Sequence, residues 1–226
     1  MKKVLLFVLL GLMTACGASS ETAKGNAEID GEQAKAAFEK AFPAVEVRDV
    51  RAAPMAGMLA LEVNGSETVY MSEDGRFIMI GKLLELKDGE VVNPAEQRLE
   101  KVRAEGIKTL NKDDMITYAA EDEKVEVYVF TDISCGFCRK LHRPTTEAAA
   151  SMRHIWCAQD RQQALSDAKL NDTINKAELG ECAKPVDEQY ELGLTFGVRG
   201  TPAIYTTEGK QLGGYLTPED MLKRLD

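Results

Sequence analysis

Short runs in which apolar and polar residues alternate fill the first third of the chain and predict β-strands. Two such runs cover residues 45–50 and 59–63. Asn64-Gly65 then gives a strong signal for a hairpin turn, and residues 68–71 are the predicted returning strand. A longer apolar run at residues 77–86 predicts one further strand.

A helix and several methionines complete this first region. The helix is predicted over residues 28–42, from an apolar stripe of Ala34, Ala37, Phe38 and Ala41. Together with the strands it predicts a small α+β domain at residues 28–90. Four methionines fall in this domain, and they are interpreted either as core or as an adaptable apolar surface for unfolded clients: Met55, Met58, Met71 and Met79.

Residues 91–111 are strongly charged and predict a helix that links two domains. Asn93-Pro94 is a typical helix start. The helix is expected over residues 95–104 and ends, in this interpretation, at Gly106.

The second half of the chain mixes strand and helix patterns and predicts an α/β domain at residues 112–226. Its clearest strand is residues 125–130, a nearly continuous run of β-branched and aromatic residues. Residues 115–119 predict a short strand ahead of it. The later elements are a helical tract at 146–170, a helix at 187–196, strands at 200–205 and 211–215, and a final helix capped by Thr217.

The strand at 125–130 leads directly into the most informative motif of the chain, Cys135-Gly136-Phe137-Cys138. Ser134 is a good N-cap, so Cys135 is expected in the first turn of a helix, with Cys138 three residues on along the same face. The helix dipole and the free N–H groups favour a thiolate at Cys135 and make it a nucleophile. Cys138 can then attack a mixed disulfide formed at Cys135.

A structural zinc site is the alternative explanation of a Cys-x-x-Cys motif. Such a site needs a second closely spaced pair of ligands, but Cys157 and Cys182 are single and far apart. His142 and His154 are also too widely separated to form a ligand pair. We therefore predict a redox site, with no metal and no cofactor.

A strand that opens with Thr201-Pro202 follows the Cys-x-x-Cys helix in the chain. This order is the second half of the thioredoxin signature, in which the proline is cis and faces the reactive cysteine. Proline is the residue for which a cis bond costs little, roughly 0.5–1 kcal/mol. Backbone groups beside it stay free to pair with an extended substrate segment. The alternative is an ordinary proline at a strand edge.

The first 15 residues have the pattern of a secretory signal peptide. Lys2 and Lys3 precede an apolar run that is too short to span a membrane. The run leads to Cys16 in a sequence that resembles a bacterial lipobox, with Met13 where the pattern prefers Leu, Val or Ile. Lipidation of Cys16 and ordinary cleavage near Ala15 or Ala18 are the two interpretations. Residues 16–27 are small and polar and predict a flexible tether.

Net charge and cysteine content limit the kinds of partner the protein binds and the compartment in which it works. The chain of 226 residues has a net charge of -9, which becomes -11 when Lys2 and Lys3 are removed with the signal peptide. An acidic surface argues against nucleic acid as a partner. Of the five cysteines, assigning Cys16 to lipid leaves two pairs, which suits an oxidising compartment.

These motifs together resemble the DsbC-type periplasmic disulfide isomerases over most of the chain after the signal peptide. The resemblance implies a homodimer held by the N-terminal domain, and a thioredoxin-like domain with a helical insertion. It implies Cys135 as nucleophile, a cis Thr201-Pro202 bond, and a structural disulfide between Cys157 and Cys182. It further implies a substrate surface at Gly136, Phe137, Thr201 and Pro202. The segments that carry the resemblance are 53–58, 74–75, 129–133, 135–138, 140–142, 155–158 and 200–203.

The chain departs from this family in one element. The family has a β-strand between the active-site helix and the Trp156 helix, but nothing between Arg139 and Ala158 predicts a strand here. The strand at 125–130 would then lack a neighbour on one side unless residues 115–119 take that place. Arg139 also stands where the family commonly has histidine.

The leading functional hypothesis is thiol–disulfide interchange on misfolded envelope or secreted proteins. In this hypothesis a membrane-bound electron donor of the DsbD type keeps the protein reduced in the periplasm, and the lipid on Cys16 is its only membrane contact. One rival is a thiol reductase that protects single cysteines. The other is a non-catalytic, client-binding lipoprotein whose thioredoxin domain has been disrupted by the missing strand.

Overall fold

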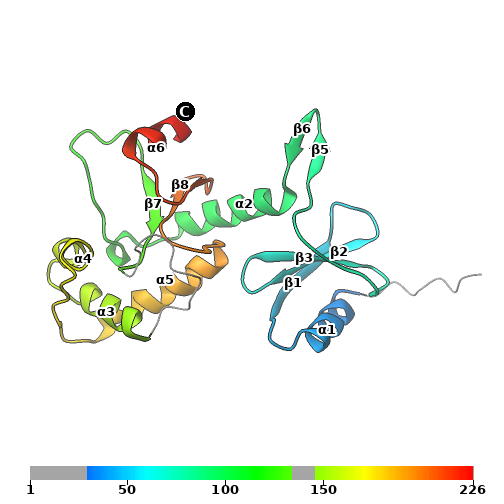
Figure 1. The fold of residues 1–226 in the computed structure, drawn as a ribbon, viewed down its shortest axis with the longest axis horizontal. Coiled ribbons are helices and arrows are strands. Elements are labelled where there is room, and N and C mark those ends of the chain that lie inside the picture. The colour runs from blue at the N-terminus through cyan, green and yellow to red at the C-terminus, as the bar shows by residue number, and fades with distance from the viewer. Residues whose placement is uncertain (1–29, 134–145, 226) are drawn as a thin grey trace, which may run out of the picture.

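The computed structural model describes residues 30–133 and 146–225, and these form two domains (Figure 1). In the first, helix α1 (Gly31–Ala41) begins at Asp30, whose side chain accepts a hydrogen bond of 2.8 Å from the N–H of Gln33. Its buried residues Ala34 and Phe38 pack on an antiparallel sheet. The sheet has the order β1-β2-β3-β4, from strands β1 (Val47–Ala52), β2 (Met58–Val63), β3 (Glu67–Ser72) and β4 (Ile78–Ile80).

The predicted hairpin turn at Asn64-Gly65 is confirmed. Val63 of β2 pairs with Glu67 of β3, so the loop has three residues, and Asn64 and Gly65 both have positive φ, 49° and 94°. The predicted strand at residues 77–86 is wrong. The chain leaves the sheet at Gly81, with φ of 151°, a conformation that few other residues adopt. It then forms a separate ribbon of β5 (Glu85–Lys87) and β6 (Glu90–Val92).

The four methionines of this domain divide between core and surface. Met71 is buried in the sheet core, whereas Met55 and Met79 are exposed. Neither of the two interpretations from the sequence therefore holds for the whole set.

Helix α2 (Pro94–Lys108) is more than the linker that the sequence predicts, because its second half is part of the core of the second domain. The helix does not end at Gly106. A Cβ atom at that position would lie 2.6 Å from the ring of Phe196, so glycine allows the helix to approach this ring. Figure 1 shows α2 running from the first domain into the second.

Arg103 of α2 is the largest fully buried side chain described, with 1% of its surface exposed. Its Nε atom donates to the carbonyl oxygen of Phe196 at 2.8 Å, and Nη1 donates to Glu96 at 2.6 Å and to the carbonyl of Gly209 at 3.4 Å. The guanidinium carbon lies 4.8 Å from the centre of the Tyr205 ring, a cation–π contact. The buried charge is therefore compensated by three acceptors and one aromatic face.

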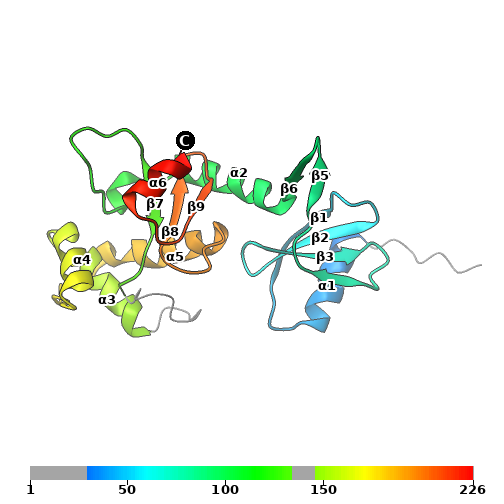
Figure 2. The same ribbon diagram turned by 45° about the horizontal axis from the view of Figure 1, so that its top comes forward.

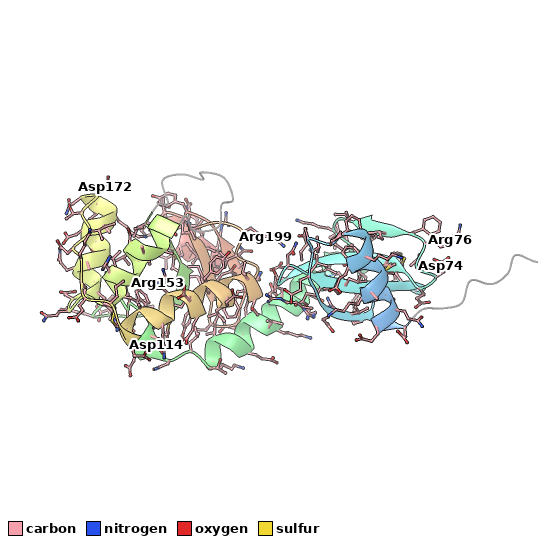
Figure 3. All side chains as sticks on the ribbon, turned by 90° about the horizontal axis from the view of Figure 1, so that it is seen from below. Asp74, Arg76, Asp114, Arg153, Asp172 and Arg199 are labelled. Atoms are coloured by element: carbon pink, nitrogen blue, oxygen red, sulfur yellow. A yellow bond between two sulfur atoms is a disulfide. The ribbon has the colours of Figure 1, made fainter. Side chains whose placement is uncertain are left out.

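Ion pairs join α2 to the first domain. Arg98 pairs with Glu62 of β2, whose side chain is largely buried, and at 3.6 Å with Asp49 of β1. Between the domains themselves, Arg199 lies 3.5 Å from Glu67, and Figure 3 shows Arg199 at this junction. The pair of Arg199 and Glu67 is exposed, and such pairs contribute typically about 0–1 kcal/mol.

The second domain has a sheet in the order β7-β8-β9 within the described residues, as Figure 2 shows. Strands β7 (Val127–Phe130) and β9 (Gln211–Gly213) flank β8 (Ala203–Thr206), which is buried along its whole length. One face packs against α2 and α5 (Lys184–Thr195) through Ile107, Phe196 and Tyr205. The remaining elements are α3 (Thr146–Trp156), α4 (Arg161–Leu170), α6 (Pro218–Leu225), and the short turns η1 (Lys112–Asp114) and η2 (Glu181–Ala183).

One prediction for this domain is confirmed in part, and another is wrong. The tract at 146–170 is two helices, because the chain turns after Trp156 and Asp160 caps a new helix by accepting from the N–H of Gln163 at 2.9 Å. Residues 115–119 form no strand. They lie instead against α4, where Gln162 donates to the carbonyl of Thr117 and Tyr118 donates to the carbonyl of Gln162.

Replacement of Arg103 tests the role of α2 in the second domain. We expect Arg103→Ala to lower the free energy of unfolding of this domain by about 2–4 kcal/mol, because it leaves two buried carbonyls without a donor and opens a cavity. Urea unfolding followed by the fluorescence of Trp156, the single tryptophan, measures it. Arg98→Ala is the control and should cost less than about 1 kcal/mol. Equal losses in the two variants would contradict this role of Arg103.

Candidate functional site

The two motifs predicted to form the site come together through the pairing of β7 and β8. The strands are antiparallel, and their register sets Phe130 opposite Ala203. Phe130 is the last residue of the strand that leads to Cys135, and Ala203 follows Thr201-Pro202 directly. The peptide bond between Thr201 and Pro202 is cis, as predicted, and both residues are partly buried.

The four residues of the Cys135-Gly136-Phe137-Cys138 motif lie outside the described residues, as does His142. The structure therefore fixes the strand that leads to this motif and the loop that is expected to face it. Cys16 and the signal peptide also lie outside the described residues.

A cluster of three aromatic side chains packs against strands β7 and β8. The rings of Phe130, Phe196 and Tyr205 meet edge to face, with centre-to-centre distances between 5.6 and 6.2 Å. Burial raises the pKa of the Tyr205 hydroxyl, and the positive charge of Arg103 acts in the opposite direction. Arg103 contacts Tyr205 and Phe196, and through these residues it supports the β7–β8 pair.

The chain just after β7 is anchored to the helical part of the domain. Lys169 of α4 donates a hydrogen bond of 2.5 Å to the hydroxyl of Thr131. Ile133 packs against Ile155 and Trp156 in a second apolar cluster. Sequence reasoning did not find Lys169 or Arg103. A buried arginine on a charged helix has no sequence pattern that separates it from its exposed neighbours.

The disulfide predicted between Cys157 and Cys182 is confirmed. Its sulfur atoms are 2.00 Å apart, and it joins the end of α3 to η2, immediately before α5. Arg153 and Asp187 form an ion pair of 2.6 Å between α3 and α5, and Figure 3 labels Arg153 on its helix. The disulfide and the ion pair connect the same two helices, so this part of the domain has a structural role.

The described residues offer no place for a metal ion. Over residues 30–133 and 146–225, no three or more His, Cys, Asp or Glu side chains gather as ligands. His154 has its Nδ1 atom 2.8 Å from the carbonyl oxygen of Ala177, a contact within the fold. Within the same residues, no helix has both the length and the apolar character needed to cross a membrane.

Comparison with known families divides the chain as the structure does. Residues 19–96 match the model for the disulfide bond isomerase protein N-terminal domain, and residues 111–226 match the model for a thioredoxin-like domain. The fold and the cis-proline loop beside the strand that precedes Cys-x-x-Cys therefore define a two-domain protein of the thioredoxin class.

Similarity to individual proteins identifies the family within this class. The chain is 32% identical to a thiol:disulfide interchange protein DsbC from Dickeya dadantii, an alignment that covers 100% of this chain and 95% of the relative. Proteins of the same name from Haemophilus influenzae and Escherichia coli are 34% and 31% identical; the alignments cover 78% and 80% of this chain and 82% of each relative. The chain belongs to the DsbC family of thiol:disulfide interchange proteins.

Loss of the disulfide should destabilise the second domain. Cys157 and Cys182 are separated by 25 residues, and cross-linking a loop of this length is worth about 3–4 kcal/mol in the chain-entropy model. We expect the double variant Cys157→Ser/Cys182→Ser to lose stability of this order in urea unfolding, with little change in the first domain. A double variant as stable as the parent would contradict a structural role for this bond.

Proposed function

We propose that Cys135 and Cys138 are the redox-active pair of a thiol:disulfide isomerase that acts on misfolded disulfide-containing proteins. The observation that carries the proposal is the β7–β8 register. It brings the residue after the cis Thr201-Pro202 bond beside the strand that leads to Cys135. Gly136 and Phe137, with Thr201 and Pro202, are the proposed substrate surface. Family membership supports the same chemistry.

In the proposed reaction the Cys135 thiolate attacks one sulfur of a client disulfide. A bond forms between Cys135 and that sulfur, and the other client sulfur leaves as a thiolate. A second client thiolate can then attack the mixed disulfide, which releases Cys135 and leaves a rearranged client. Alternatively, Cys138 attacks Cys135, which reduces the client and leaves a Cys135–Cys138 disulfide.

Proton transfer at Cys138 must use a group other than a buried carboxylate. Many thioredoxins place such a carboxylate six residues before the first cysteine, but here that residue is Val129, and it is half-exposed. Water or His142, one helical turn beyond Cys138, is the proposed proton carrier.

The compartment proposed for this reaction is the periplasm. A structural disulfide persists in an oxidising compartment, and the Cys157–Cys182 bond fits this location. The apolar leader and the lipobox-like sequence at Cys16 support export and a lipid anchor, with residues 16–27 as the tether. Release through Cys138 oxidises the pair, so the cycle needs a membrane-bound electron donor that reduces it again.

Replacement of each cysteine tests the proposed reaction. Cys135→Ser should abolish rescue of scrambled ribonuclease, because it removes the nucleophile. Cys138→Ala should keep attack but accumulate mixed disulfides, visible on non-reducing gels.

In the parent, Cys135 should be alkylated by iodoacetamide near neutral pH well before Cys138. Equal alkylation rates, with neither variant different from the parent, would favour the non-catalytic alternative. Reduction of single-cysteine clients without rescue of scrambled ribonuclease would favour the reductase.

The first domain is the proposed dimer interface. Several large apolar side chains are exposed in and around β4, β5 and β6, among them Phe77, Ile80, Leu86 and Val91, each at least 61% exposed. Exposed apolar side chains are common at interaction sites, and in a symmetric dimer the same residues of both copies would be covered.

Sedimentation tests the interface with matched variants. The chain without its signal peptide should sediment as a dimer at micromolar concentration, and residues 93–226, which retain α2, as a monomer. Leu86→Glu should weaken the dimer by at least about tenfold, because it places a charge in apolar contact. Leu170→Glu in α4 changes a leucine of the same 82% exposure in the other domain and should leave the dimer intact. A dimer unaffected by Leu86→Glu would exclude this surface.

A further inference from the structure

The outer edge of β7 has no strand beside it in the part of the chain that is described. β7 pairs with β8 along its inner edge, from Val127 opposite Thr206 to Phe130 opposite Ala203. Figure 2 shows β7 on the side of β8 away from β9. Backbone groups along a strand point alternately to its two sides, so about half of those in β7 are directed outward. An edge of this kind is a template for another strand.

Two described segments that could cover this edge lie elsewhere. The described part of the region between the Cys-x-x-Cys motif and Trp156 is helix α3. The alignment with the Dickeya dadantii relative spans 248 positions, so at least 22 of them hold no residue of this 226-residue chain. Residues 115–118 are held against α4 by Gln162 and Tyr118.

The side chains of β7 make this edge suitable for an apolar strand. Tyr128 and Phe130 face the core formed by Phe196 and Tyr205. Val129 points to the opposite face of the sheet and is 48% exposed. A segment added beside β7 would therefore find apolar neighbours on both of its faces, which favours β-branched and aromatic residues.

The position of the edge connects it to the proposed site. A segment paired with β7 would run past Phe130 at the end that leads to Cys135, five residues later in the chain. On the other side of Phe130 lies Ala203, directly after the cis proline. An extended client bound along β7 is thus carried to the same end of the sheet as the two motifs of the proposed reaction.

A second copy of the chain is a poorer occupant than a client segment. A four-residue strand offers much less contact area than the roughly 1,200–2,000 Å² that stable protein interfaces bury. An unfolded client needs only a short extended stretch and weak, reversible binding.

We propose that the outer edge of β7, Val127–Phe130, binds extended apolar segments of unfolded clients by main-chain hydrogen bonds. The inference rests on the proposed function for the identity of the occupant. Binding itself needs no thiol, so a probe without cysteine separates this proposal from the proposed function. Thiol exchange can fail while the probe still binds, and the probe can fail to bind while thiol exchange continues.

The probe is a fluorescein-labelled eight-residue peptide of alternating valine and threonine, titrated into the full chain and followed by anisotropy. Val129→Lys puts a charge beside the edge, as natural edge strands do to prevent pairing, and should weaken binding by at least about tenfold. Leu179→Lys is the control, since Leu179 is 47% exposed in a loop, and it should bind as the parent does. The same peptide N-methylated at its central amides should not bind.

Amide hydrogen exchange locates the peptide. Saturating peptide should slow exchange in β7 and leave β9, the opposite edge of the same sheet, unchanged. Three results would overturn the proposal: Val129→Lys binding as tightly as the parent, equal protection of β7 and β9, or protection of β7 that rises with protein concentration in the absence of peptide. The last result would assign the edge to a second copy.

Discussion

One buried charge organises the second domain and its connection to the first. Arg103 enters the domain from α2 and is satisfied by the carbonyls of Phe196 and Gly209, by Glu96, and by the face of Tyr205. An arginine with 1% exposure is tolerated because Nε and Nη1 donate to these acceptors and the guanidinium lies against an aromatic ring. The aromatic residues it contacts also support β7 and β8. The helix that leaves the first domain is therefore fixed to the strands that carry the proposed chemistry.

Much of the fold could be predicted because it depends on local patterns. The Asn64-Gly65 turn, the strand before Cys135 and the cap at Thr217 each follow from neighbouring residues, and the structure contains all three. The errors arise where residues far apart in the sequence determine the local structure. Residues 115–119 have strand composition, but α4 takes up their backbone groups. Gly106 is a reasonable helix end in sequence, yet the ring of Phe196 occupies the space where other residues have a Cβ atom.

For the candidate site too, some features could be predicted from the sequence and others could not. The cis proline and the Cys157–Cys182 bond could be predicted, because each is a motif or implied by the family that the motifs resemble. The role of Cys135 and Cys138 stays a prediction. The supports of the site could not be predicted. Lys169 meets Thr131 across 38 residues of sequence, and Arg103 meets Phe196 across 93, and nothing local marks either side chain. The residues proposed to carry the chemistry lie in short sequence motifs. The residues that support them are positioned by packing between distant parts of the chain.

The rigidity of α2 restricts how the length of this protein can change. Each residue of an α-helix adds 1.5 Å and turns the chain by roughly 100°. One residue inserted or deleted between Asn93 and Arg103 would swing the first domain around the helix axis, while Arg103 kept the second domain in place. The helix therefore fixes both the distance between the two domains and the rotation of one relative to the other. A change in the length of this helix would therefore change the direction in which the two domains face.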